Sequence, residues 1–231
     1  MDNWSNHVPF RLRSQGAGAQ VLSMAWRSGK QLASELAQIS MQNVFNPYRD
    51  RCSSHDLVDA PAIRRANLAA VVDAAIGRGC AELWVGLELG ARGGRRTGLA
   101  LTDEFMMEQC GAYWGLQRLR RATRGDAMQE QTARYVWGAV IGRPRPVFFW
   151  NAFPFHSHMP GSITNRGHTL AERLAVPPIL PWLVDVLGVI RIVALGRAAE
   201  RAVADHGLSA HYVRHPGRGG GAAFLDAIRQ V

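Results

Sequence analysis

The chain has 231 residues and a mass of 25.4 kDa, which fits one α/β domain, or one such domain with an N-terminal extension. Hydrophobic residues make up 47% and charged residues 19%, and this composition excludes a mainly disordered chain. Basic residues number 27 against 18 acidic ones, the net charge is +9, and Lys30 is the one lysine. This arginine excess favours a polyanionic partner, because a guanidinium group binds phosphate with two donors. A genome rich in arginine codons would leave the same excess.

The sequence gives no sign of a membrane span or a secretory signal. The longest apolar run, residues 174–190, is interrupted by three prolines and by Asp185, whereas a spanning helix needs about 20 apolar residues. The N-terminus has no apolar block before a small-residue cleavage site. Three scattered cysteines favour a reducing compartment over a disulfide framework. We therefore expect a cytoplasmic protein that does not bind membranes.

Secondary-structure signals divide the chain into an extension and one domain. Residues 1–40 show no regular pattern and are interpreted as an N-terminal extension, and residues 41–231 as a single domain. A helix begins at Pro61 and ends at the glycines 77 and 79. Two helices are expected between residues 103 and 141, one after the Thr169–Glu172 capping box, one over 197–206 and one after glycines 219–221. Strands are predicted at 82–86, 147–151, 191–195 and 211–214.

Strands that alternate with helices predict a mainly parallel sheet covered on both faces. In such sheets the ligand binds beyond the carboxyl ends of the strands. Three of the four strands lead into a polar group suited to chemistry there, namely Glu88, Asn151 and His215. This convergence predicts a site at one edge of the sheet.

Each of the three groups has a chemical and a structural interpretation. Glu88, between two glycines, can orient water or offset a developing positive charge, or it can pair with a neighbouring arginine. Asn151 can read an amide-like edge, such as that of a pyrimidine, or bond its own backbone in a turn. His215 can donate a hydrogen bond to an oxygen that gains negative charge, or be structural. Arg218 and the glycines after it form a basic loop suited to phosphate contact.

Three histidines, at positions 156, 158 and 168, lie between the second strand and the next helix. They suggest zinc, but their spacing lacks a pairing with cysteine or a helix-borne histidine pair. We therefore expect no metal site.

Several short motifs occur in a recognisable order at the strand ends. They are GLELG at 86–90, the segment from Arg92 through Arg95-Arg96 to Gly98, Thr102-Asp103-Glu104, NAFPFH at 151–156, GRAAE at 196–200, and His215-Pro216. With these motifs the chain resembles the uracil-DNA glycosylase superfamily, in particular its bacterial members, from residue 46 to residue 224.

The resemblance implies a three-layer α/β/α sandwich with a central four-stranded parallel sheet. It implies a DNA repair enzyme that flips a deaminated base, usually uracil, out of DNA and hydrolyses its N-glycosidic bond without a metal or other cofactor. Glu88 and His215 would be catalytic, and Asn151 would bind the base together with Gly86, Gly90 and Leu101. The DNA contacts would come from Arg92, Arg95, Arg96, Arg218 and Gly219. We expect a monomer in the bacterial cytoplasm whose partner is DNA containing uracil or another deaminated base.

The chain departs from the superfamily pattern at several positions. Members place Asp or Asn at the third position of the first motif, where this chain has Glu88, or Glu at the second, where it has Leu87. The proline usual at the fourth position is Leu89. The most uracil-selective members have a tyrosine at the position of Gly90. Members also stack a phenylalanine on the base from the segment that matches residues 98–102, where this chain has Leu101. Arg218 and Gly219 replace the Pro-Leu type of wedge sequence.

Two other classes of function stay open from the sequence. The altered first motif fits a non-catalytic relative that binds uracil-containing DNA and leaves it intact. Residues 85–94, VGLELGARGG, also resemble the first motif of S-adenosylmethionine-dependent methyltransferases. Those enzymes usually need glycine where Arg92 stands, and an acidic residue at the end of the next strand.

Overall fold

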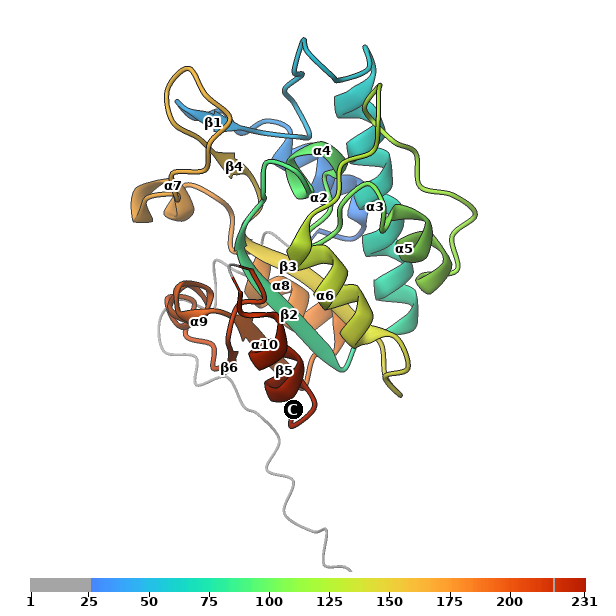
Figure 1. The fold of residues 1–231 in the computed structure, drawn as a ribbon, viewed down its shortest axis with the longest axis vertical. Coiled ribbons are helices and arrows are strands. Elements are labelled where there is room, and N and C mark those ends of the chain that lie inside the picture. The colour runs from blue at the N-terminus through green and yellow to red at the C-terminus, as the bar shows by residue number, and fades with distance from the viewer. Residues whose placement is uncertain (1–25, 218) are drawn as a thin grey trace, which may run out of the picture.

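The computed structural model of the chain describes residues 26–217 and 219–231. Four parallel strands form the central sheet in the order β3-β2-β5-β6 (Figure 1). They are β2 (Glu82–Glu88), β3 (Val147–Phe153), β5 (Arg191–Leu195) and β6 (His211–Val213). The predicted α/β class with a four-stranded parallel sheet is confirmed. Because all four strands run the same way, their carboxyl ends meet at one edge, as the ligand-site argument requires.

Helices cover both faces of this sheet. Helix α6 (Gln131–Val140) contacts α10 (Gly221–Ile228), and both lie on the face toward the viewer of Figure 1. Helix α8 (Ile179–Leu187) lies behind the sheet and contacts α3 (Ala60–Arg78). Helix α9 (Arg197–Ala204) packs on β2 and β5. The core between these layers includes Leu83, Trp84 and Val85 of β2, which have no exposed surface.

The remaining elements are short. Helix α5 (Met107–Tyr113) precedes α6 in the segment where two helices were predicted. Two short helices are α4 (Gly94–Thr97) and α7 (Leu170–Leu174), and the Thr169–Glu172 capping box begins α7 as predicted. A separate two-stranded antiparallel sheet pairs β1 (Val44–Phe45) with β4 (His156–Ser157), and the sequence had not indicated it.

Strands β2 and β3 are two residues longer than predicted. Gly86 pairs with Asn151, and Glu88 pairs with Phe153. The predicted ends at residues 86 and 151 were therefore wrong, because the ladder between the two strands continues past them. Glu88 and Asn151 consequently lie on paired strands, whose geometry holds their backbones more firmly than a loop would.

Residues 174–190 contain helix α8 despite their prolines. Two prolines precede the helix, and Pro181 lies in its first turn, where the missing N–H has no intrahelical partner to lose. In the described ranges, no helix is long and apolar enough to cross a membrane.

The described part of the predicted extension packs against the domain. Helix α2 (Gly29–Leu36) begins at Ser28, whose side chain accepts a hydrogen bond from the backbone of Gln31. Its buried side chains, Leu32 and Leu36, belong to the same core as the sheet, and the helix contacts α3. Residues 1–25 of the extension lie outside the described residues.

Candidate active site

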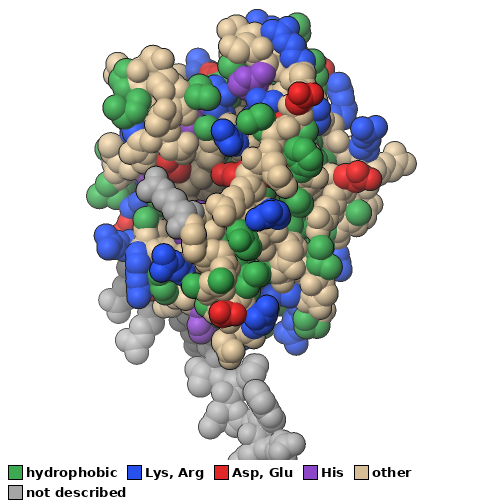
Figure 2. All heavy atoms as spheres, in the orientation of Figure 1, with side chains coloured by type: hydrophobic (Ala, Val, Ile, Leu, Met, Phe, Trp, Pro, Cys, Tyr) green, Lys and Arg blue, Asp and Glu red, His purple; other side chains and the backbone are tan. Residues whose placement is uncertain are grey.

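A cleft of about 850 Å³ lies at the carboxyl edge of the sheet. The loop after β2, the segment before α6 and the loop after β6 form most of its wall. Figure 2 shows acidic and basic side chains around a hollow near the centre of this face. The lining includes these residues predicted from the sequence: Gly86, Glu88, Gly90, Arg92, Leu101, Asn151 and His215. Side chains from distant parts of the chain therefore share one cavity.

The Glu88 carboxyl accepts hydrogen bonds from three residues that follow β3. Ser157 Oγ donates at 2.6 Å, Asn165 Nδ2 at 3.3 Å, and His168 donates from its backbone N–H at 2.9 Å and from Nδ1 at 3.1 Å. Burial alone would raise the Glu88 pKa, but the hydrogen bonds from His168, Ser157 and Asn165 outweigh it and hold the pKa below its ordinary value. Glu88 is therefore a carboxylate at neutral pH. Within the described residues it forms no ion pair with an arginine, so that alternative is not what the structure shows.

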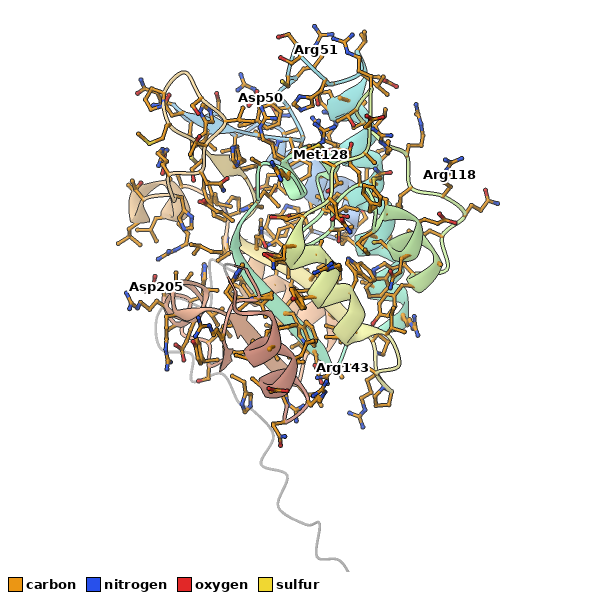
Figure 3. The ribbon with its side chains drawn as sticks, in the orientation of Figure 1. Asp50, Arg51, Arg118, Met128, Arg143 and Asp205 are labelled. Atoms are coloured by element: carbon orange, nitrogen blue, oxygen red, sulfur yellow. The ribbon has the colours of Figure 1, made fainter. Side chains whose placement is uncertain are left out.

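Contacts with Arg173 and Phe153 orient the His168 ring. Its Nε2 accepts a hydrogen bond from Arg173 at 3.3 Å, and its ring stacks on Phe153 at 4.6 Å between centroids. Arg173 in turn pairs with Asp205 at the end of α9, at the left of Figure 3. Because Nε2 is an acceptor, the ring proton stays on Nδ1 and points at Glu88. The chain Asp205–Arg173–His168 thus fixes both the tautomer and the donor that Glu88 receives.

The side-chain oxygen of Asn151 is buried and has no partner among the described residues. Its Oδ1 makes no hydrogen bond to any described residue, although the side chain is almost fully buried. A Cβ at Gly86 would lie 2.6 Å from this oxygen, so the glycine makes the room that the amide occupies. The structural alternative, an amide that bonds its own backbone, is not observed among the described residues. A buried acceptor left unpaired at a cleft wall is the feature expected of a group that a ligand completes.

Leu101 lies beside Asn151 in an unusual conformation. Its φ is 51°, in the left-handed region that costs a side chain about 1–3 kcal/mol and that clusters at functional sites. Its Cδ2 lies 3.1 Å from the position of a Cβ at Gly86. The strained backbone therefore presents a leucine face next to the Asn151 amide, as a ring-packing residue would require.

His215 follows β6 in a turn rich in glycine. Its Nδ1 accepts a hydrogen bond from the Gly217 backbone N–H at 3.0 Å. This places the ring proton of the neutral form on Nε2, which is then the donor atom of the ring. Gly219, in the same turn, is exposed and has a φ of 78°, and Arg218 lies outside the described residues.

The predicted DNA contacts of Arg95 and Arg96 need correction, because both side chains are buried. Arg95 is 6% exposed and lies 4.1 Å above the ring of Phe45. Arg96 is 8% exposed and donates to Glu104 at 2.9 Å. The two guanidinium groups hold the segment around α4 together and do not face solvent. Arg92 is exposed and lines the cleft, which keeps it available to phosphate.

The cleft also contains polar residues that the sequence reasoning had not selected as site residues. Glu130, Tyr212 and Arg214 line it, and so does Asn165, the residue that bonds Glu88. No sequence signal distinguished Glu130 from the other acidic residues. Tyr212 and Arg214 lie next to the predicted His215, so their places follow from the same strand-end rule.

The three histidines considered for zinc do not form a ligand set. His156 is fully buried, and its two ring nitrogens lie 2.9 Å and 3.1 Å from the carbonyl oxygens of Leu89 and Ile163. His168 bonds Glu88 and Arg173, as described above. Across the described ranges, no group of three His, Cys, Asp or Glu side chains is placed to hold a metal ion.

Comparison with solved structures finds a similar fold. The crystal structure of wild-type SMUG2 from Pedobacter heparinus matches with a TM-score of 0.56 and 12% sequence identity, over 89% of this chain and 95% of that one. No protein-family model and no curated protein sequence matches the chain. At this identity the likeness shows the fold alone.

Proposed function

We propose that the protein is a DNA glycosylase that flips a deaminated base, uracil first, out of DNA and hydrolyses its N-glycosidic bond to leave an abasic site. The observation that carries this proposal is the juxtaposition of an ionised Glu88 with the unpaired amide of Asn151 and with His215 around one cleft. The fold it shares with SMUG2, a member of the uracil-DNA glycosylase superfamily, supports the same reading.

The chemistry needs opposite charges at the two ends of one bond. As the bond from the sugar carbon to the base nitrogen lengthens, positive charge grows on the sugar and negative charge on the base. Glu88 is a carboxylate held by fixed donors, so it stabilises the sugar cation without reorganising. It also accepts a hydrogen bond from the water that adds to the sugar carbon. The electron pair of the broken bond leaves with the base.

The base is read by other groups that line the cleft. The Asn151 amide can donate to one atom and accept from its neighbour, which matches the carbonyl and N–H edge of uracil. Leu101 packs against the ring face. His215 donates from Nε2 to the base oxygen that gains negative charge. These side chains act with water, and the proposed reaction uses neither a metal nor an organic cofactor.

Arginines supply the electrostatic attraction to DNA. Arg92 and Arg214 are exposed at the cleft, where phosphates on either side of an extruded nucleotide would lie. Extrusion costs a few kcal/mol of unstacking and is easiest for a mismatched base, so uracil opposite guanine should be a favoured substrate. We propose that the protein acts as a monomer on chromosomal DNA in the bacterial cytoplasm.

Oligonucleotides with one uracil, single-stranded or opposite guanine or adenine, test this proposal. After incubation with chelator present, alkali reveals abasic sites as strand breaks. We expect breaks at the uracil with the wild-type protein and a rate at least about 100-fold lower with Glu88→Gln, which keeps the size but removes the charge. Glu108→Gln, on the exposed side of α5, is the matched control and should cleave normally.

Two results would contradict the proposal. Cleavage by Glu88→Gln at the wild-type rate would remove Glu88 from the chemistry. Tight binding of uracil-containing DNA by the wild-type protein without any breaks would instead show a binding protein.

A further inference from the structure

Glu130 has a carboxyl group on the cleft wall that the proposed reaction does not yet use. The residue immediately precedes α6, and its backbone N–H donates to Asp103 at 2.6 Å. Its side chain lines the same cavity as Glu88. The cavity therefore has two carboxyl groups on walls that come from different parts of the chain.

Two glycines of the loop after β2 make the place for this carboxyl. A Cβ at Gly90 would overlap Oε1 of Glu130, and a Cβ at Gly93 would overlap Oε2. The carboxyl thus occupies the space that side chains at both loop positions would need. Any other residue at either position would displace the Glu130 carboxyl from the cleft wall. The two glycines therefore determine where this carboxyl lies.

The surroundings of Glu130 differ from those of Glu88. Among the described residues, no donor forms a hydrogen bond with its carboxyl oxygens, whereas Glu88 receives four. Burial, together with the charge of the fully buried Asp103, raises the Glu130 pKa to about 7. The pKa of Glu88 is shifted the opposite way. Two carboxyls with pKa values pushed apart are the pattern of an acid and a base in one site.

Other charged side chains and a histidine also line this cavity. Glu88 and Arg92 face it from the end of β2 and the loop that follows, and Arg214 and His215 from the end of β6. Asp103 lies behind Glu130. The exposed arginines are open to solvent and to phosphate, which leaves Asp103 as the close and unscreened neighbour of the Glu130 carboxyl.

We propose that Glu130 is the general acid of the site and delivers its proton to the departing base. This inference rests on the proposed glycosylase function and adds a residue to it. The bond between the sugar carbon and the base nitrogen breaks, and its electron pair goes to the base. The base takes the proton from the Glu130 carboxyl, and water adds its oxygen to the sugar carbon. The proton released by that water restores the acid through solvent.

The decisive experiment compares two leaving groups. Uracil and 5-fluorouracil are placed in otherwise identical single-stranded oligonucleotides, and single-turnover rates are measured from pH 5.5 to pH 8.5. Fluorine lowers the proton affinity of the departing 5-fluorouracil anion. Its departure therefore needs less help from a general acid than the departure of uracil does. We expect Glu130→Gln to lower the uracil rate about 100-fold and the 5-fluorouracil rate less than about tenfold. The wild-type uracil rate should also fall as the pH rises through about 7, and this fall should be absent from the variant.

A direct titration of the Glu130 carboxyl tests the inference without a substitution at this residue. The side-chain carboxyl of Glu130, followed by ¹³C NMR in the wild-type protein, should titrate near pH 7. A midpoint near the ordinary value of 4.5 would overturn the inference. Glu108→Gln again serves as the control for loss of a surface carboxyl and should match the wild type on both substrates.

The outcomes separate this inference from the proposed function. If the wild-type protein cleaves both substrates and Glu130→Gln cleaves them equally well, the inference fails and the glycosylase function stands. An equal loss on both substrates shows that Glu130 does not protonate the leaving base and also overturns the inference. If the wild-type protein cleaves neither substrate, the proposed function fails and the inference fails with it.

Discussion

Replacement of Glu130 by glutamine should stabilise the protein in a way that depends on pH. The glutamine keeps the shape of the side chain in the space that Gly90 and Gly93 leave open. It removes a carboxyl whose pKa is raised in the folded state, which means that folding disfavours the ionised form. Between the unfolded and folded pKa values, the folded protein holds a proton that the unfolded chain has released. Wild-type stability therefore falls as the pH rises through this window, and the glutamine variant is spared that loss.

The size of this stability difference follows from the pKa shift of Glu130. A pKa raised from 4.5 to about 7 corresponds to about 3 kcal/mol once both states are ionised. Some of this loss has already occurred at pH 5, and solvent in the cleft screens the rest. We expect Glu130→Gln to gain about 2 kcal/mol over wild type on going from pH 5 to pH 8. For a chain of this size that corresponds to about 4–8 °C in Tm.

Thermal or urea unfolding of both proteins at the two pH values measures this gain. The comparison between pH values cancels any cost of burying the glutamine amide, because that cost is the same at both. Glu108→Gln, which removes an exposed carboxyl, should show no such change. A Glu130→Gln difference in stability that is equal at pH 5 and pH 8 would mean that Glu130 ionises as freely in the folded protein as in the unfolded chain, contrary to this expectation.

Three further substitutions test other parts of the account. Gly86→Ala puts a Cβ 2.6 Å from Asn151 Oδ1 and should displace the amide, which should lower the rate of uracil excision at least about tenfold. Thermal unfolding should show a stability loss of only about 1–3 kcal/mol. Excision at the wild-type rate would contradict the role of the Asn151 amide. Arg92→Ala should reduce the slope of log binding constant against log salt by about one, measured by anisotropy with labelled DNA, and an unchanged slope would mean that Arg92 meets no phosphate. Arg96→Ala removes the guanidinium that donates to the buried Glu104 at 2.9 Å, while Arg121, Thr123 and the Met128 backbone still contact that carboxylate. Urea unfolding should therefore show a loss of about 2 kcal/mol while the salt slope stays the same. A reduced salt slope would instead place Arg96 at the DNA.

The sequence predicts the parallel sheet, and with it the residues that the carboxyl edge brings together, for a physical reason. Short apolar runs separated by helical periodicity determine a parallel sheet, and in such a sheet the residues at the strand ends share one edge. Glu88, Asn151 and His215 could therefore be grouped although they are far apart in the chain. The lengths of β2 and β3 were underestimated, because the ladder that extends them depends on pairing between distant residues.

The environment of each side chain could not be predicted in the same way. Arg95 and Arg96 look like solvent-facing charges in the sequence, and their burial depends on Phe45 and Glu104, which the fold brings to them. The donors to Glu88 come from strand β4 and the segment after it, 69 to 80 residues later in the chain.

Glu130 illustrates the same limit more sharply. The sequence shows one more acidic residue before a helix. Its raised pKa depends on burial and on the charge of Asp103, in a place that two loop glycines leave open. Local pattern indicates which groups reach the site, and long-range packing decides their charge.

The proposed glycosylase releases a deaminated base by hydrolysis. The most direct test quantifies the free base by mass spectrometry after incubation of the wild-type protein with a uracil-containing oligonucleotide and chelator, alongside a count of the abasic sites formed. The account predicts one molecule of free uracil for each abasic site, with the rest of the strand intact before alkali. Retained binding with no free uracil and no abasic sites would contradict it.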